Sequence, residues 1–370
     1  MAQVAVVHNT LDFQGGADAV CLATCEALLT EHDVTLFTLG ETAPTDLADR
    51  FEADVADIVV RTPLANPWIA KTLSRLGPTF GPQLAFRSVL VGQYFMFHAD
   101  SFDLTVSTAN EISLPVPSLQ YVHYPQFHLR NLEHATHGRL NQLWSWIAGP
   151  ERETLQNTTL LANSAWTADT VEEIYDVRPT VLHPPVDSID GGLNWEQREN
   201  GIIILGRIAP DKRVLEAITI VDRLRDRGQD VHLHIVGSAP RLYRPYVERV
   251  TTEADRRAHV TLERDVSRER LEALLRTHRY GLNLKSNEHF GMSVAEYVEA
   301  GMIAFAPDGG GQREILNGRS DRLFDSIAAA VDTIETSLER DDRPSVPRDR
   351  FDRERFKSKI RTHANRTLDR

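Results

Sequence analysis

Two glutamates in the second half of the chain have a spacing that could serve chemistry. Glu288 and Glu296 lie in the stretch NEHFGMSVAEYVEAG, with Gly291 between them. Carboxylate oxygens accept hydrogen bonds from sugar hydroxyls, and a glycine lets the backbone approach a ligand closely. Ser293 and Glu296 also fit the S-x-x-E capping box, which would begin a helix here. A capping box leaves Glu288 unexplained, so we predict a binding role for Glu288.

A second loop carries positive charge. Gly206 and Arg207 follow the apolar run IIIL, and Lys212 lies where the next helical pattern starts. Two cations beside a helix N-terminus oppose the helix dipole and cost stability unless an anion binds. Arginine offers a bidentate fork and lysine a point charge, which together suit a diphosphate. We therefore favour a ligand-binding role over a solvated surface for this loop.

Two glycine-containing loops complete the candidate site. Gly15 and Gly16 precede a helical pattern, where free N–H groups could bind a phosphate, although a plain turn explains them equally well. The dinucleotide fingerprint G-x-G-x-x-G is not matched there. Glycines 309–311, with Gly310 at the centre, precede a short helix that carries Glu314. Cations for phosphates and carboxylates for hydroxyls together describe a nucleotide-sugar site.

The elements around these loops predict an α/β protein. Buried strands are expected where short apolar runs alternate with helical patterns. The runs are VAVVHN, DVTLFTL, FDLTVST, SLQYVHY and TLLANS, then IIILGR, VHLHIVG, HVTLER, YGLNLK and MIAFAP. A Pro- and Gly-rich stretch at 184–200 separates the two series and resembles a linker. We predict two doubly wound Rossmann-like domains facing a cleft, at 1–186 and 187–345, and a C-terminal helix within 346–370 that packs back on the first domain.

Composition limits the classes of partner. The chain of 370 residues exceeds what one hydrophobic core usually supports. Its formal charge of −12 argues against nucleic-acid binding, which needs a clustered basic surface. Cys21 and Cys25 are one helical turn apart and fit a helix core better than a metal site or a disulfide. The first residues lead directly into a strand without signal-peptide features, so we predict a cytoplasmic protein.

Two apolar segments, 64–97 and 140–149, have two possible interpretations: they contact a membrane, or they lie in the protein interior. Segments of this kind can lie on a membrane surface, but buried helices have the same pattern, and we favour the interior. The aromatic residues that could meet a lipid acceptor are Trp68, Phe86, Tyr94, Trp144 and Trp146.

The motifs resemble those of the retaining GT-B glycosyltransferases of family 4. The hallmark of that family is a pair of glutamates separated by seven residues, present here as EHFGMSVAE. The GR…K loop and the glycine-rich loop before Glu314 match in order and spacing, and the resemblance covers nearly the whole chain. Finer matches to the branch that extends dolichol-linked oligosaccharides with α-linked mannose are YVHYP, NSAWT, HPPVD and NEHFG.

The resemblance implies a role for each candidate residue. Arg207 and Lys212 would neutralise the leaving diphosphate, while Glu288 would orient the transferred sugar. The residues that would contact the donor are Gly15, Gly16, Gly206, Arg207, Lys212, Glu288, Phe290, Gly291, Glu296, Gly310 and Glu314, with Glu296 on the ribose. His123 follows a buried strand and would lie near the donor sugar and the acceptor; a structural role is its alternative.

The resemblance also implies the partners. The donor would be GDP-mannose and the acceptor a lipid-linked or other glycan, at the cytoplasmic face of a membrane. No cofactor is expected, and no D-x-D motif occurs, which agrees with a metal-independent transferase. A UDP-sugar transferase, a nucleotide-sugar epimerase, a phosphorylase and a non-catalytic subunit with the same fold stay open as alternatives.

Overall fold

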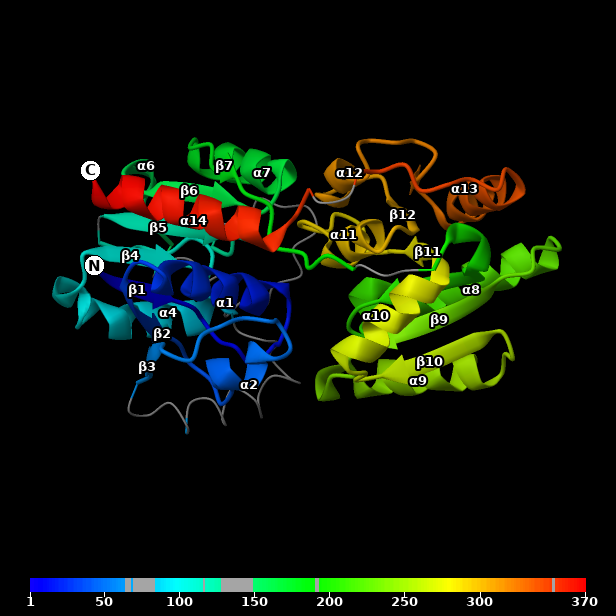
Figure 1. The fold of residues 1–370 in the computed structure, drawn as a ribbon, viewed down its shortest axis with the longest axis horizontal. Helices are drawn as coiled ribbons and strands as arrows, with labels where there is room; N and C mark the ends of the chain where they lie inside the picture. The colour runs from blue at the N-terminus through cyan, green and yellow to red at the C-terminus, as the bar shows by residue number, and fades with distance from the viewer. Residues whose placement is uncertain (64–67, 69–83, 116, 128–148, 190–192, 348–349) are drawn as a thin grey trace. The chain divides into compact units, whose positions relative to one another are not determined.

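The computed structural model describes residues 1–63, 68, 84–115, 117–127, 149–189, 193–347 and 350–370. The chain divides into two compact units. Unit 1 comprises Met1–Pro185 with Arg353–Arg370, and unit 2 comprises Val186–Asp352. Each unit has a sheet of parallel strands with helices packed on both faces (Figure 1). The predicted α/β class with two doubly wound domains is confirmed.

Unit 1 contains a seven-stranded sheet of order β3-β2-β1-β4-β5-β6-β7. Its strands are β1 (Gln3–Val7), β2 (Asp33–Phe37), β3 (Val59–Arg61), β4 (Leu104–Ser107), β5 (Ser118–Val122), β6 (Thr159–Ala162) and β7 (Thr180–Val181). The described α-helices are α1 (Gly16–Leu29), α2 (Pro44–Ala48), α4 (Leu84–Met96), α6 (Arg152–Gln156), α7 (Ala165–Tyr175) and α14 (Arg353–Leu368).

Alternation along β1 explains why both faces of this sheet are covered. Val4 and Val6 belong to the core that α1 and α14 share. Ala5 and Val7 belong to the opposite core, against α4. Because successive strand residues point to opposite faces, an apolar run without polar interruptions needs a helix layer on each side. The C-terminal helix α14 lies beside α1, far from it in sequence (Figure 1).

Two helices of unit 1 bear on the predictions about buried segments. Cys21 and Cys25 are free, fully buried cysteines of α1, as the core interpretation expected. Helix α4 packs Val91 and Phe95 into the core and its Arg87 is buried, so one face of this helix belongs to the interior, while Met96 and Phe97 at the end of the segment are 46% and 85% exposed. Trp144 and Trp146 lie outside the described residues.

No helix in the described part of the chain is both long and apolar enough to span a membrane.

Unit 2 contains a six-stranded sheet of order β10-β9-β8-β11-β12-β13. Its strands are β8 (Glu199–Leu205), β9 (His232–Gly237), β10 (Val260–Arg264), β11 (His278–Leu282), β12 (Ile303–Pro307) and β13 (Leu323–Phe324). Its α-helices are α8 (Val214–Asp226), α9 (Arg244–Asp255), α10 (Arg268–Thr277), α11 (Met292–Glu299), α12 (Gln312–Ile315) and α13 (Ile327–Glu339). One face packs on α8, α9 and α13, and the other on α10 and α11.

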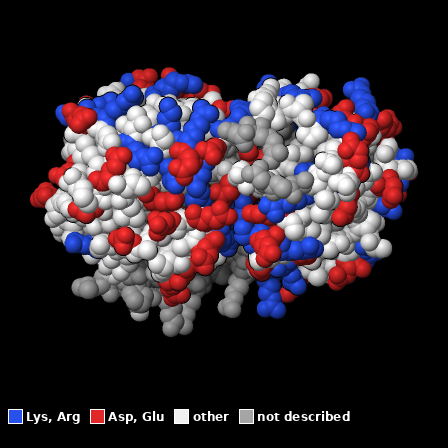
Figure 2. All heavy atoms as spheres, viewed as in Figure 1, with Lys and Arg blue, Asp and Glu red and all other residues white. Residues whose placement is uncertain are grey.

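Charged side chains of both signs are interspersed over the surface of each unit on the side shown in Figure 2. Exposed residues of unit 2 form ion pairs, such as Arg227 with Asp332 at 2.8 Å and Arg244 with Glu248 at 2.9 Å. Exposed pairs of this kind contribute little to stability individually, typically ~0–1 kcal/mol.

Candidate functional site

The order of strands in unit 2 indicates where a ligand would bind. Winding starts at β8, proceeds to one side through β9 and β10, and then returns to the other side of β8 at β11. Ligands of doubly wound sheets bind outside the carboxyl ends of the strands at this reversal. The loop after β8 carries Gly206 and Arg207, and the loop after β11 carries Lys285 and Glu288. The fold therefore brings the predicted cation loop and the predicted carboxylate to the same edge.

Glu288 lies between two lysines at this edge. Lys212 Nζ is 2.5 Å from one carboxylate oxygen, and Lys285 Nζ is 3.2 Å from the other. The three side chains are between 14% and 23% exposed. Lys285 was not predicted as a site residue, although lysine is rare in this sequence. Its position three residues before Glu288 is the signal that could have identified it.

The lysines determine the protonation of Glu288. Burial alone would raise the pKa of this carboxyl group, but the charges of Lys212 and Lys285 lower the pKa to about 2. Burial, together with the charge of Lys285, lowers the pKa of the adjacent His289 to about 4. At neutral pH Glu288 is therefore an anion that accepts hydrogen bonds, and His289 is uncharged.

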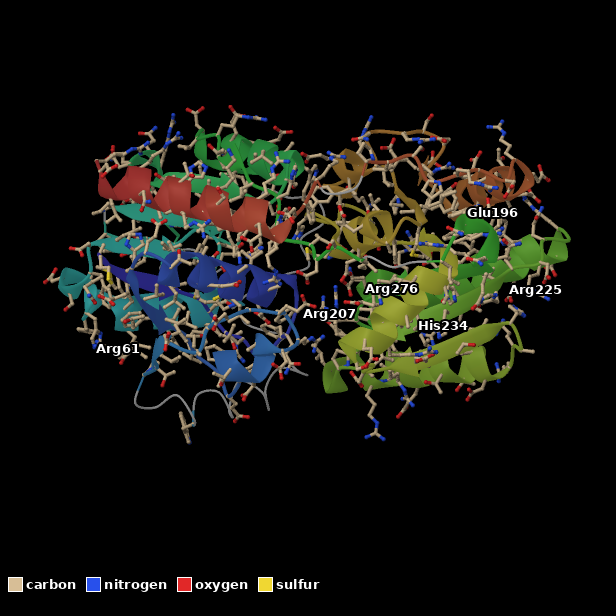
Figure 3. The ribbon with its side chains drawn as sticks, viewed as in Figure 1. Arg61, Glu196, Arg207, Arg225, His234 and Arg276 are labelled. Carbon is tan, nitrogen blue, oxygen red and sulfur yellow. The ribbon has the colours of Figure 1, made fainter. Side chains whose placement is uncertain are left out.

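Positive charge exceeds negative charge in this cluster. Asp211 is 3.7 Å from Lys285 and 3.8 Å from Arg207. The side chain of Arg207, labelled in Figure 3, is 47% exposed. The cations Arg207, Lys212 and Lys285 are balanced only in part by the carboxylates of Asp211 and Glu288. An anionic ligand would complete the balance.

The glycine-rich loop holds the Glu288 loop in place. Gly310 has φ +68°, and a Cβ at this position would lie 2.3 Å from the carbonyl oxygen of Glu288. The amide of Gly311 donates a 2.8 Å hydrogen bond to that same oxygen. A Cβ on Gly311 would be 2.5 Å from the carbonyl oxygen of His289. Only glycine permits this close approach, so the loop has a structural role whether or not its amides contact a ligand.

A buried pair of amide side chains, not predicted from the sequence, connects the loops. Asn283 Nδ2 donates a 2.6 Å hydrogen bond to Gln312 Oε1. Gln312 Nε2 donates in turn to the carbonyl oxygens of Pro307, at 3.0 Å, and Lys285, at 3.2 Å. Both side chains are buried. The pair links the ends of β11 and β12 to the start of α12, and its signal in the sequence is a polar residue within each buried segment.

The predicted capping box is wrong. Helix α11 begins at Met292, with Gly291 as its N-cap and no side chain bonded to the cap. Gly291 has φ +112°, a conformation that favours glycine, so the chain enters the helix before Ser293 can act as a cap. Ser293 is buried inside the helix instead. Phe290 is buried too and packs edge-on against Phe351, with ring centroids 5.3 Å apart.

Glu296 is paired with an arginine. Arg268 Nη1 lies 3.3 Å from Glu296 Oε1, and the same guanidinium is 3.7 Å from Asp187. Burial raises the pKa of Glu296, and the charge of Arg268 opposes this shift only in part. Glu288 and Glu296 thus have opposite pKa shifts because their environments differ. Glu314 is half-buried in α12.

In unit 1, the predicted glycines begin α1. Gly15 is the N-cap and Gly16 the first helical residue. The amide of Gly15 donates a 3.0 Å hydrogen bond to Asp18, and the other carboxylate oxygen of Asp18 is 3.1 Å from His8 Nε2. This helix start therefore already has a carboxylate of its own.

His123 follows β5 at the carboxyl end of the unit 1 sheet. Its ring is half-buried and lies 5.0 Å from the ring of Tyr121, between centroids. Its backbone is fixed from both sides. The amide donates a 2.7 Å hydrogen bond to Asn110 Oδ1, and the carbonyl oxygen accepts a 3.0 Å hydrogen bond from Asn163 Nδ2.

Comparison with known proteins identifies the family. The model described as Glycosyltransferase Family 4 matches residues 14–188, and the model described as Glycosyl transferases group 1 matches residues 186–348. The two matches together cover nearly the whole chain. The chain belongs to the family 4 glycosyltransferases, with the GT-B fold.

Several curated relatives of this glycosyltransferase have the name GDP-Man:Man(3)GlcNAc(2)-PP-Dol alpha-1,2-mannosyltransferase. The protein from Neurospora crassa is 24% identical over 308 residues, covering 68% of this chain and 54% of that protein. The one from Candida glabrata is 26% identical over 159 residues, covering 39% and 32%. The one from Dictyostelium discoideum is 27% identical over 188 residues, covering 45% and 37%. The chain thus spans about a third to a half of the length of these relatives.

Solved structures share the fold of this glycosyltransferase. HepE from Anabaena, determined in complex with UDP and glucose, superimposes with a TM-score of 0.69 at 14% identity, covering 98% of this chain and 99% of that one. A glycosyltransferase from Rickettsia africae gives a TM-score of 0.60 at 14% identity, covering 100% and 96%. These similarities support the GT-B fold and nothing finer.

Proposed function

We propose that this chain transfers a hexose from a nucleoside-diphosphate sugar to an acceptor hydroxyl, with retention of configuration and without a catalytic metal. The observation that carries the proposal is the cluster of Lys212, Glu288 and Lys285 at the reversal of strand order in unit 2. It combines positive charge for a diphosphate with an ionised acceptor for sugar hydroxyls. Membership of the family supports the same class of reaction.

In the proposed reaction, the bond from the anomeric carbon to the β-phosphate oxygen breaks while a bond to the acceptor oxygen forms on the same face. The proton of the acceptor hydroxyl passes to the departing phosphate oxygen, so no separate base is required. Lys212 and Arg207 stabilise the negative charge that develops on the diphosphate. Glu288 accepts hydrogen bonds from hydroxyls of the transferred sugar and orients its anomeric carbon. Protonation would remove the negative charge of Glu288 and turn one of its acceptor oxygens into a donor, and the low pKa of this group prevents protonation at neutral pH.

We further propose GDP-mannose as the donor and a polyprenyl-diphosphate-linked glycan as the acceptor. The names of the curated relatives support both, at low identity and partial coverage. The enzyme would then work at the cytoplasmic face of a membrane. Glu296 would bind the ribose, and the amides near Phe290, Gly291 and Gly310 would bind phosphate or sugar. Residues proposed to complete the donor and acceptor sites are Gly15, Gly16, His123, Gly206 and Glu314.

Calorimetric titration with GDP, UDP, GDP-mannose and UDP-glucose tests the donor. We expect GDP-mannose to bind most tightly, and Lys212→Ala to weaken the binding of GDP and GDP-mannose alike, because Lys212 acts on the diphosphate. Glu288→Gln should weaken GDP-mannose more than GDP, because Glu288 acts on the sugar. Lys359→Ala, which removes an exposed lysine of α14, is the matched control and should change neither.

Each other outcome has a defined meaning. If a UDP donor binds more tightly than GDP-mannose and its binding still depends on Lys212, the assignment as a transferase stands. The donor then contains uracil in place of guanine, and another sugar in place of mannose. Binding of a donor that Lys212→Ala leaves unchanged would contradict the proposed site. If folded protein binds none of the four compounds, the non-catalytic alternative replaces the enzyme.

A further inference from the structure

Three side chains that can bind metals meet at the amino end of the unit 2 sheet. Glu199, His232 and His278 are the first residues of β8, β9 and β11, which are neighbouring strands. They lie at the opposite end of these strands from the loops that carry Arg207 and Glu288. The candidate donor site therefore does not account for them.

The pairing of the strands brings the three residues together. Glu199 of β8 is the register partner of His278 of β11, and Gly201 of β8 is the partner of His232 of β9. The register between β8 and β11 shifts after His278, which places this residue on the same face of the sheet as Glu199. His234, labelled in Figure 3, follows on the same face of β9 and is bonded to Glu263 at 2.8 Å.

The distances between the three groups fit a tetrahedral metal ion. His232 Nε2 is 3.3 Å from His278 Nε2 and 3.3 Å from Glu199 Oε2. One ligand atom from each residue lies within 4.8 Å of the other two. Zinc ligands at about 2.0–2.1 Å in a tetrahedron are separated from one another by about 3.3–3.4 Å. Two of the three separations already have this value, and the half-exposed Glu199 side chain can adjust the third.

His278 is held in the tautomer that a metal requires. Its Nδ1 is 2.9 Å from the backbone carbonyl oxygen of Leu274, which can only accept a hydrogen bond. Nδ1 therefore carries the proton, and Nε2 presents a lone pair towards His232. A carbonyl oxygen that orients a ligating histidine in this way is common in metal sites.

A glycine provides the space in which the imidazole rings meet. A Cβ on Gly201 would lie 2.3 Å from Cδ2 of His278 and 2.5 Å from Nε2 of His232. The residue at this position of β8 must lack a side chain for the two rings to approach. A glycine inside a strand weakens it, and the approach of the two histidines explains its presence here.

We propose that Glu199, His232 and His278 bind a divalent transition-metal ion of the zinc type, with water as a fourth ligand. Without a metal, the single Nε2 proton of His232 must serve both His278 and Glu199, each at 3.3 Å, a distance beyond that of a good hydrogen bond. A metal ion satisfies all three lone pairs at once. Because the ligands come from three adjacent strands, the ion fixes their amino ends and stabilises unit 2.

Titration of the 370-residue chain with Zn²⁺, after treatment with a chelator, tests the proposal. We expect one tight site and a rise in melting temperature when Zn²⁺ is added. His232→Ala and Glu199→Gln should each weaken this site by more than ~10-fold, since even outer partners of metal ligands typically contribute 10–100-fold. Both side chains are at least 36% exposed, so these substitutions should leave the fold intact. Circular dichroism verifies this.

His259→Ala is the matched control. His259 forms a 2.8 Å pair with Asp222 in the same unit, but it is not part of a group of three potential ligands among the described residues. This variant should bind Zn²⁺ like the wild type. The absorption of bound Co²⁺ in the visible range should have the intensity of a tetrahedral site and disappear in His232→Ala. Absence of a stoichiometric site, or a site of equal affinity in both folded ligand variants, would overturn the proposal.

Discussion

The two glutamates of the candidate site should respond to pH in opposite directions. The folded-state pKa of Glu288 is about 2, below its ordinary value of 4.5. A depressed carboxyl pKa contributes stability above pH 4.5 that is lost as the pH falls towards 2. The lowering from 4.5 to about 2 corresponds to about 3 kcal/mol in total, of which about 1 kcal/mol is lost by pH 3.5. Burial raises the pKa of Glu296, so protonation of that residue should stabilise the folded state instead.

Urea unfolding between pH 7 and pH 3.5 measures this difference. Trp195 is the only tryptophan of unit 2, and its resonance in 5-fluorotryptophan-labelled protein reports the unfolding of that unit. On acidification to pH 3.5, the free energy of unfolding of the wild type should fall by about 1 kcal/mol more than that of Glu288→Gln. On the same acidification, the wild type should lose less free energy of unfolding than Glu296→Gln, because the variant lacks the stabilising protonation of Glu296. Equal pH dependence in wild type and Glu288→Gln would refute the argument that the lysines hold Glu288 ionised.

Two further predictions concern the loops around Glu288. Gly310→Ala should destabilise the protein by about 2–4 kcal/mol, from the positive φ and the contact with the carbonyl oxygen of Glu288, and should weaken donor binding. Gly92→Ala, at a helical glycine with open space around it, is the control and should be neutral or slightly stabilising in urea unfolding. Asn283→Leu and Gln312→Leu should each cost about 1–3 kcal/mol, because each leaves a buried polar partner unsatisfied. The double substitution should cost less than the sum of the two, and additive costs would show that the two amides are not coupled.

The strands with strong apolar patterns were predictable from the sequence. The runs VAVV and IIIL are apolar at every position, so each predicts a strand that is buried on both faces of its sheet. The loops that follow these strands must then lie at the carboxyl end of the sheet. The short strands β3, β7 and β13 were not predicted. β7 and β13 contain only two residues each, and pairing with a neighbouring strand defines them better than their own composition does. The start of α11 was misplaced because the S-x-x-E pattern outweighed a glycine at positive φ.

The site residues were predictable only where several charged residues and glycines occur close together in one segment of the sequence. Glu288 and Lys212 were singled out from their loops, and the structure shows that they touch. The contacts of Asn283 with Gln312 depend on how β11 and β12 end, which no local pattern records. The three potential metal ligands were missed for the same reason. His232 lies 33 residues after Glu199 and 46 residues before His278, and only the pairing of their strands brings the three together.

Transfer of labelled mannose tests the central claim most directly. GDP-mannose is incubated with a polyprenyl-diphosphate-linked glycan and with the wild type, Lys212→Ala, Glu288→Gln or Lys359→Ala. We expect an α-linked mannosyl product from the wild type and from Lys359→Ala, and loss of the product in the other two variants while they stay folded. Undiminished transfer by Lys212→Ala and Glu288→Gln would contradict the assignment of the reaction to this cluster.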